Sequence, residues 1–328
     1  GHLTIASSVP QPFGRTSLQT FIPMPQVIRQ TATVPSERAG ERLDHVAVVL
    51  FPDFSRSQLQ TWIRAGELRV DGKTRRPRDT MFGGEALELN AEQEALNFEA
   101  QDLPLDVVFE DDALLVINKP AGLVVHPGQG NPDATVLNAV LHRLPGNSVL
   151  PRAGIVHRLD KDTTGLMVIA RTSGAQNELV AQLQAHTVRR VYDAVVYGLP
   201  PESGTIDEPM GRHPVHRTRM AVREGGKPAI THYEVIGWFE HHSLVRVRLE
   251  TGRTHQIRVH MAHLGFPLVG DPVYSRLKLP KHSEPLREAI RGFPRQALHA
   301  GRLAFIHPET REEVAFRAPR PADLAGLI

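Results

Sequence analysis

Residues 154–171 read GIVHRLDKDTTGLMVIAR and place the mostly charged block HRLDKD between two apolar runs. The run Leu166–Ala170 that follows the block has the composition of a buried strand, and a glycine precedes it. A surface turn needs only polar residues and a glycine. This block instead carries Arg158 and Asp160 two positions apart at the edge of an apparent core. An ordinary turn and a functional loop are both open interpretations of this block.

Further short apolar runs recur between residues 107 and 328 and have the length of strands. Two segments of the same region, Asn138–Leu144 and Ala175–Gln184, have apolar residues at helical spacing. Many strands with a few helices predict an α+β fold with a mixed, mainly antiparallel sheet flanked by helices and loops. The predicted strands are Leu114–Ile117, Leu123–Val125, Leu166–Ala170, Val191–Tyr197, Leu244–Leu249 and Ile257–Val259.

The composition limits the possible classes of protein. The chain has 328 residues, of which 41% are hydrophobic, enough for a sizeable core in one large or two moderate domains. No run reaches the ~20 apolar residues of a membrane-spanning helix. The absence of cysteine excludes disulfides, thiolate catalysis and cysteine-ligated zinc or iron–sulfur sites. It fits a reducing compartment, and we expect a cytoplasmic protein that does not contact membranes.

Changes in composition divide the chain into segments. Residues 1–23 differ from the rest and lack the basic and apolar regions of a signal peptide, so we expect a vector-derived or disordered tail. Residues 24–40 are predicted to form an extended lead-in to a compact unit at 41–90. Residues 91–106 are acidic and contain no Lys or Arg, which predicts a linker. The larger domain follows at 107–328.

The unit 41–90 combines two helical patterns with two strand patterns. Ser55 can cap its second helix, Gly66 can end that helix, and an Asp-Gly turn follows a short strand. Basic residues cluster over the start of the helix and the turn. A solvated surface and contact with an RNA backbone are both open interpretations of this cluster. The candidates for RNA contact are Arg56, Arg64, Lys73, Arg75 and Arg76.

The aspartate of the opening block, Asp160, allows several interpretations. An aspartate at a turn can simply cap the next element. A phosphorylated aspartate of the P-type ATPase kind requires the order D-K-T-G-T, whereas this chain reads D-K-D-T-T-G. A calcium-binding loop needs oxygen ligands where Leu166 and Val168 stand. The last two interpretations are therefore rejected, and a cap or a catalytic carboxylate remains.

Two later segments carry further polar candidates. Tyr192, in the strand-like stretch 189–195, either packs in the core or offers a ring on which an unstacked base rests, worth ~1–3 kcal/mol. Arg253 and Arg258 can pair bidentately with carboxylate or phosphate. In a strand, Arg258 would lie on the face opposite its apolar neighbours. That placement favours a functional arginine over a solvated one.

The same segment contains His255, His260 and His263, whose spacing suggests a metal site. The first two histidines are five positions apart, which does not place two ligands on one face of a helix. No carboxylate at fixed spacing completes the set. We therefore predict that the protein binds no metal.

Six ordered stretches make the chain similar to RluA-family pseudouridine synthases, most of all to the RluD type. The unit 41–90 resembles the S4 RNA-binding domain through RLDHVAVVLFPDFSRSQLQTWIRAGELRVDGK and the Gly83-Gly84-Glu85 that follows. Together the resemblance covers the chain from about residue 28 to 320. The stretches are NKPAGLVVHPG (118–128), AGIVHRLDKDTTGLMVIAR (153–171), RVYDAVVYG (190–198), GKPAITHYEV (226–235), LETGRTHQIRVHMAHLGFPLVGDPVY (249–274) and QALHAGRLAFIHP (296–308).

The resemblance implies a role for each matching residue. Asp160 matches the catalytic aspartate, and Arg258 matches the arginine that pairs with it. Tyr192 matches the tyrosine that stacks on the target base, and Arg158 matches the arginine that fills the space left by the flipped nucleotide. Asp160 acts either as a nucleophile at C1′ or as a base at C2′, and no cofactor is required. Further substrate contacts are expected from His157, Arg253 and His255.

The resemblance also implies the substrate. RluD-type enzymes modify uridines in the helix-69 stem-loop of 23S rRNA, so we expect a monomer that binds this RNA within the large ribosomal subunit or its precursor. A synthase acting on tRNA and a catalytically silent ribosome-assembly factor are the alternatives. An N-glycosidase would break the same bond but commonly needs a second acid. Only Asp162 is close to Asp160 in sequence, and we interpret it as a turn residue.

Overall fold

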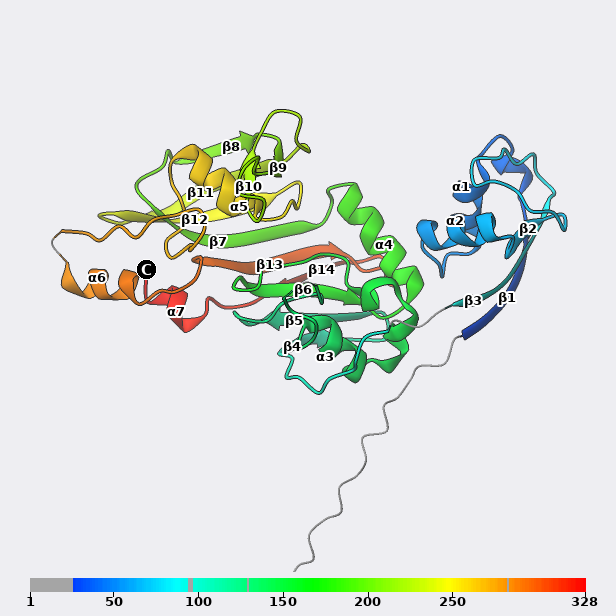
Figure 1. The fold of residues 1–328 in the computed structure, drawn as a ribbon, viewed down its shortest axis with the longest axis horizontal. Helices are drawn as coiled ribbons and strands as arrows, with labels where there is room; N and C mark the ends of the chain where they lie inside the picture. The colour runs from blue at the N-terminus through cyan, green and yellow to red at the C-terminus, as the bar shows by residue number, and fades with distance from the viewer. Residues whose placement is uncertain (1–25, 94–96, 129, 282) are drawn as a thin grey trace, which may run out of the picture.

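The computed structural model describes residues 26–328 except 94–96, 129 and 282. The predicted tail 1–23 lies outside the described residues. Figure 1 shows a small unit drawn in blue and cyan and a large unit that contains the rest of the chain. Among the described residues, no helix has the length and apolar content needed to cross a bilayer.

The small unit packs two helices against an antiparallel sheet. Its elements are β1 (Gln26–Thr33), α1 (Leu43–Leu50), α2 (Arg56–Ala65), β2 (Leu68–Val70) and β3 (Ala86–Gln93), with the strand order β1-β3-β2. Ser55 caps α2 by accepting a hydrogen bond from the backbone N–H of Gln58 at 3.2 Å, and Gly66 ends the helix in the left-handed region, as predicted. Because β1 pairs with β3 along its whole length, the lead-in supplies an edge strand of this sheet.

The large unit is built on a nine-stranded mixed sheet (Figure 1). Its order is β4-β5-β6-β13-β7-β12-β11-β8, with β14 paired to β13. The pairing of β6 with β13 is parallel and the others are antiparallel, which confirms the predicted mixed, mainly antiparallel sheet. The strands are β4 (Val107–Glu110), β5 (Leu114–Lys119), β6 (Thr164–Ala170), β7 (Arg189–Tyr197), β8 (Ser203–Asp207), β11 (Ile230–Trp238), β12 (His242–Leu249), β13 (Leu298–Ile306) and β14 (Glu313–Arg317).

Two of the predicted strands are wrong. Ile257–Val259 belongs to a helix, α5 (Gln256–Leu264), which Gly265 ends. A three-residue apolar pattern cannot separate a strand from a buried helix, and here Ile257 packs in the core with Met261, four positions along. Leu123–Val125 is a loop. Its backbone carbonyls accept hydrogen bonds from the first N–H groups of the next helix, because the first N–H groups of a helix have no partner within it.

The remaining elements complete the large unit. The predicted helices 138–144 and 175–184 are confirmed. A short hairpin of two strands, β9 and β10, extends from the large unit and is not part of its main sheet. These elements are α3 (Val136–Arg143), α4 (Ser173–Gln184), α6 (Glu284–Arg291), α7 (Ala322–Ala325), β9 (Met210–Arg212) and β10 (Met220–Val222).

Gly165 lets two central strands approach closely just after the HRLD loop. Its φ is +128°, and a Cβ added there would lie 2.3 Å from the carbonyl oxygen of Ala300 in β13. Any other residue would push β6 away from β13. The glycine of the opening stretch therefore holds the start of β6, and the loop before it, against the middle of the sheet.

The small unit contacts the large one through α4. The side-chain amide of Asn177 donates hydrogen bonds to the backbone carbonyls of Pro52 and Phe54, at 2.8 and 2.6 Å. The later residues of the same helix, Val180 and Leu183, line a cavity of the large unit. One helix thus contacts both the small unit and the candidate site.

Candidate active site

A cavity of about 950 Å³ opens in the large unit between the HRLD loop, β7 and the start of α5. These segments are distant in sequence and meet because β6, β13 and β7 are adjacent in the sheet. All seven site residues predicted in the large unit line this cavity. They are His157, Arg158, Asp160, Tyr192, Arg253, His255 and Arg258.

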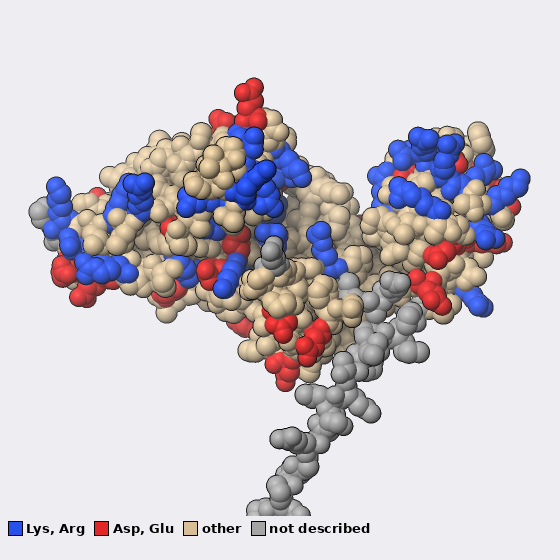
Figure 2. Space-filling model, viewed as in Figure 1, with Lys and Arg blue, Asp and Glu red and all other residues tan. Residues whose placement is uncertain are grey.

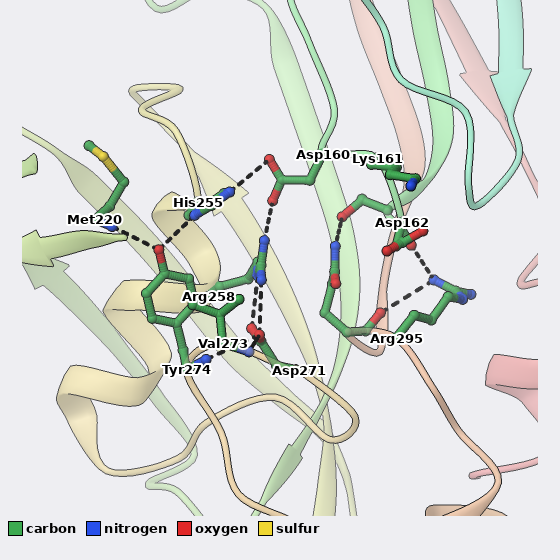
Figure 3. Close-up of polar contacts among 12 residues, drawn as sticks. Asp160, Lys161, Asp162, Met220, His255, Arg258, Asp271, Val273, Tyr274 and Arg295 are labelled. Atoms are coloured by element: carbon green, nitrogen blue, oxygen red, sulfur yellow. Dashed lines mark hydrogen bonds and ion pairs between the residues drawn. The ribbon is translucent and has the colours of Figure 1, made fainter. Parts of the chain in front are cut away.

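The centre of the site is a chain of ion pairs (Figure 3). Arg258 donates from one terminal nitrogen to Asp160 Oδ2 at 3.0 Å. Its Nε and its other terminal nitrogen donate to the two carboxylate oxygens of Asp271 at 2.8 and 2.9 Å. The side chains of Arg258 and Asp271 are 5% and 0% exposed, whereas that of Asp160 is 17% exposed. Of the two carboxylates that bind Arg258, Asp160 is therefore the one that lines the cavity.

Asp271 holds Arg258 in its charged form. Burial alone would lower the pKa of Arg258, but the hydrogen bonds and charge of Asp271, together with Asp160, raise it. Burial would raise the pKa of Asp271, and the bonds from Arg258 outweigh this effect and lower it. The guanidinium is thus fixed before substrate arrives, and a fixed charge costs no reorganisation during a reaction.

His255 lies beside the same carboxylate. It caps α5 in a left-handed conformation with φ 59°, and its Nε2 is 3.9 Å from Asp160 Oδ1. Its Nδ1 is hydrogen-bonded to the hydroxyl of Tyr274 at 2.6 Å. Burial lowers the pKa of His255 even though Asp160 opposes the shift. A neutral imidazole therefore stands next to Asp160 at neutral pH.

The other predicted residues surround this centre. Tyr192 is 5% exposed, and burial raises the pKa of its phenol, so the ring stays neutral. His157 accepts a hydrogen bond from the backbone N–H of Val168, and burial together with Arg190 lowers its pKa to about 3. Arg158 is exposed at the cavity. Arg253 donates from Nε to the carbonyl of Pro228 at the rim.

Two buried cations support the loop that carries Asp160. Lys119 is 1% exposed, and its ammonium donates to the carbonyls of Lys161, Pro120 and Leu123 at 2.8–3.0 Å. Arg295 donates to the carbonyl of Asp162 at 3.0 Å and pairs with Asp323 of α7. The loop is thus held through its backbone, which leaves the carboxylate of Asp160 free to face the cavity. Figure 3 shows Arg295 beneath Asp162.

The small unit carries a rigid basic surface, and Figure 2 shows Lys and Arg gathered over its upper part. The carboxylate of Asp44 is fully buried and accepts hydrogen bonds from Arg42, Arg56 and Gln60. The two arginine side chains remain 47% and 50% exposed. Of the residues predicted to bind RNA, Arg56 belongs to this cluster, and Arg64, Lys73, Arg75 and Arg76 are exposed on the same unit.

Within the described ranges, no three His, Asp or Glu side chains gather in a way that would hold a metal ion. Two of the three histidines whose spacing suggested a metal have other partners. His260 is hydrogen-bonded to the hydroxyl of Thr231 and to the carbonyl of Glu208, and His255 is bonded to Tyr274.

The sequence did not point to Asp271, Tyr274, Lys119 or Arg295. The first two stand in GDPVY (270–274), where a lone aspartate after glycine has the composition of an ordinary turn. Its carboxylate does accept the backbone N–H groups of Val273 and Tyr274. Lys119 and Arg295 each stand between apolar residues or beside a proline, and a buried cation at such a position is a signal for a structural or functional role.

The cavity thus combines a buried arginine set between two carboxylates with a neutral tyrosine, and the separate small unit offers a basic surface that fits an RNA backbone. Comparison with known proteins agrees. Residues 113–263 match the family described as RNA pseudouridylate synthase, and residues 41–80 match the S4 domain.

The chain is similar to proteins named ribosomal large subunit pseudouridine synthase D. It is 54% identical to that of Pseudomonas aeruginosa, over 93% of this chain and 96% of the relative. It is 53% identical to that of Xanthomonas campestris, over 94% of each. Among solved structures, human RNA pseudouridylate synthase domain containing 4 matches with a TM-score of 0.53 and 27% identity, over 68% of this chain and 92% of that one. The chain belongs to the RluA family of pseudouridine synthases and carries an S4 domain.

Proposed function

We propose that this enzyme converts uridines of large-subunit ribosomal RNA to pseudouridine and that Asp160 is its catalytic residue. The observation that carries the proposal is the 3.0 Å ion pair between Asp160 and the buried Arg258, at a cavity that Tyr192 also lines. An ionised carboxylate oriented by a fixed guanidinium is suited to attack on a sugar carbon or to removal of a proton from one.

The reaction begins with a uridine leaving its stack, which costs a few kcal/mol. Arg158, exposed at the cavity, occupies the space left in the RNA, and the ring of Tyr192 stacks on the base. Asp160 then promotes cleavage of the N1–C1′ bond. The base turns, C5 bonds to C1′, and the hydrogen of C5 is released while N1 takes up a proton. Atoms balance between uridine and pseudouridine without a redox step.

Ribosomal RNA is the proposed substrate because the relatives are named for the ribosomal large subunit. These relatives align with almost the whole chain, and more than half of the aligned residues are identical. Within that RNA, the helix-69 stem-loop is the proposed target, because a base in a loop leaves its stack at a lower cost than a base in a duplex. His157, Arg253 and His255 complete the substrate site, and Arg56, Arg64, Lys73, Arg75 and Arg76 of the small unit contact the RNA. We propose that the enzyme acts as a monomer in the cytoplasm.

The test is release of tritium from C5-labelled uridine, with 23S rRNA, large subunits and tRNA as separate substrates. Release from 23S rRNA or subunits without free uracil supports the proposal. Release of uracil would make the protein an N-glycosidase. Release from tRNA alone would overturn the choice of substrate, and no release from any RNA would leave a silent assembly factor.

The buried ammonium of Lys119 predicts a pH dependence. Burial lowers its pKa to about 8 despite the charges of Asp162 and Asp160. Below this pH, the charged amine has three donors for its three carbonyls. Above it, the neutral amine has two, and one carbonyl loses its partner. We expect the single-turnover rate to fall as pH rises through about 8.

The Lys119→Met variant is the control for this pH dependence. It lacks the titrating group, so its lower activity should not decline further above pH 8. An unchanged alkaline decline in this variant, with the fold verified by circular dichroism, would assign the decline to another group.

The hydrogen bonds around Asp44 predict an effect on RNA affinity that is opposite to the one expected from net charge alone. Burial raises the pKa of Asp44, but hydrogen bonds from Gln60, Arg56 and Arg42 outweigh this effect and keep it below the ordinary value. Asp44→Asn removes a negative charge from an RNA-binding surface, yet it also releases the two arginines that the carboxylate aligns. We expect RNA affinity to fall by about threefold to tenfold, measured by filter binding.

Glu41→Gln is the matched control for Asp44→Asn. It makes the same charge change three positions away, where Glu41 pairs with the partly exposed Arg38. Charge counting predicts tighter binding for both variants. Equal or tighter binding by a folded Asp44→Asn protein would contradict an aligning role for Asp44.

A further inference from the structure

A second hollow, of about 470 Å³, lies beside the active site between two segments that are far apart in the chain. Arg219, next to β10, forms one side. Arg276 and Lys278, in the segment that follows α5, form the other side, and Tyr274 lies between them. The hollow is thus bounded by the β9–β10 hairpin and by the continuation of GDPVY.

The charge of this hollow is entirely positive. No Asp or Glu is among its lining residues, and Arg219, Arg276 and Lys278 form no ion pair within the described part of the chain. Like charges that are brought together repel one another. An anion placed between them removes that repulsion, so the hollow fits a phosphate group.

The hairpin extends the same positive surface. Between residues 210 and 227 it carries four arginines and one lysine against a single glutamate. Two of its guanidiniums donate hydrogen bonds to backbone carbonyls. Arg212 donates to the carbonyl of Arg217, and Arg223 donates to the carbonyl of Arg212. These carbonyls are neutral, so the charges of Arg212 and Arg223 remain available to a polyanion. A surface of this length suits consecutive backbone phosphates better than one small anion.

Tyr274 connects this hollow to the reacting centre. Its hydroxyl accepts a hydrogen bond from the backbone N–H of Met220, the first residue of β10, at 2.9 Å. Since that N–H can only donate, the proton of the hydroxyl is left for Nδ1 of His255, 2.6 Å away. A neutral His255 then carries its proton on Nε2, which faces Asp160. Figure 3 shows this path from Met220 through Tyr274 and His255 to Asp160.

We propose that the hollow binds RNA backbone phosphates beside the target uridine, and that Tyr274 is a positioning residue that couples this binding to His255 and Asp160. Phosphate bound between the hairpin and the segment 276–278 draws the two sides together. The hydroxyl of Tyr274, which bonds to the hairpin, then holds His255 in the tautomer that donates toward Asp160. The inference rests on the proposed action on ribosomal RNA.

The binding part is tested with Arg219→Gln and with the double variant Arg276→Gln/Lys278→Gln, in the full chain with 23S rRNA fragments. We expect KM to rise by about tenfold for the double variant, and the salt dependence of binding to weaken by about one unit of slope for each cation removed. Arg217→Gln is the matched control, since Arg217 stands on the same hairpin but does not line the hollow. A smaller loss for Arg217→Gln than for Arg219→Gln supports a phosphate site, and equal losses overturn it in favour of a diffuse basic surface.

The coupling is tested with Tyr274→Phe, which keeps the ring and removes only the hydroxyl. We expect kcat to fall by about tenfold with KM within about twofold of wild type, because the phosphate contacts remain. A rise in KM with unchanged kcat would overturn the coupling and leave Tyr274 as part of the binding wall. Wild-type turnover in the same assay separates these outcomes from failure of the proposed function, which would abolish turnover in the parent enzyme as well.

Discussion

Replacing Asp160 by asparagine is expected to abolish pseudouridine formation, with a loss of at least about 10⁴-fold in the single-turnover rate. Asparagine has nearly the same shape and still offers an oxygen to Arg258, so the ion-paired framework of the site changes little. What disappears is the negative charge needed for attack on the sugar or for removal of its proton. The measurement is tritium release at saturating enzyme.

Affinity for the RNA is the control for Asp160→Asn. The contacts of the small unit and of the basic hairpin are untouched, so the dissociation constant should stay within about threefold of wild type. A variant that binds normally and retains more than about one hundredth of the wild-type rate would move the catalytic role to another group.

Asp271→Asn is expected to have the second-largest effect, a loss of about 10²–10³-fold in the single-turnover rate. Asp271 accepts two hydrogen bonds from Arg258 and also the backbone N–H groups of Val273 and Tyr274. Asparagine can offer only one oxygen to this set, so the guanidinium loses its bidentate support and turns away from Asp160. The fold should also lose about 2–3 kcal/mol of stability, because a buried charge pair is broken.

Activity of Asp271→Asn must be measured well below its melting temperature so that the two effects are separated. Asp323→Asn is the matched comparison, since Asp323 also pairs bidentately with a buried arginine, Arg295, that does not contact Asp160. We expect that variant to lose stability with a much smaller loss of rate. Equal losses of rate in the two variants would mean that the support of Arg258 by Asp271 matters no more to the reaction than the support of the Asp160 loop through Arg295.

The residue types of the site could be recognised because several of them stand in compact motifs. Asp160 and Arg158 share one loop between apolar runs, and Tyr192 stands in a strand of nine residues. Because residues 257–259 were predicted as a strand, the sequence did not show that His255 and Arg258 approach the same carboxylate. His255 caps α5 and Arg258 lies in its first turn, and both side chains reach Asp160.

Sequence by itself determined the chemistry that this chain can perform. The order of its motifs, the carboxylate in HRLD, the arginine in HQIR and the S4-like pattern place it among the pseudouridine synthases. It also determined the local structure wherever a cap, a turn or a long apolar pattern was complete, as at Ser55 and Gly66 around α2.

Only the tertiary structure decided which groups act on one another. Asp160 and Arg258 are 98 positions apart, and Lys119 reaches the carbonyl of Lys161 across 42 positions. A hydrogen bond depends on distances of about 3 Å, and such distances follow from how β6, β13 and β7 pack and not from neighbours in the chain. For this reason the support of Arg258 by Asp271 and the path through Tyr274 became visible only in the folded molecule.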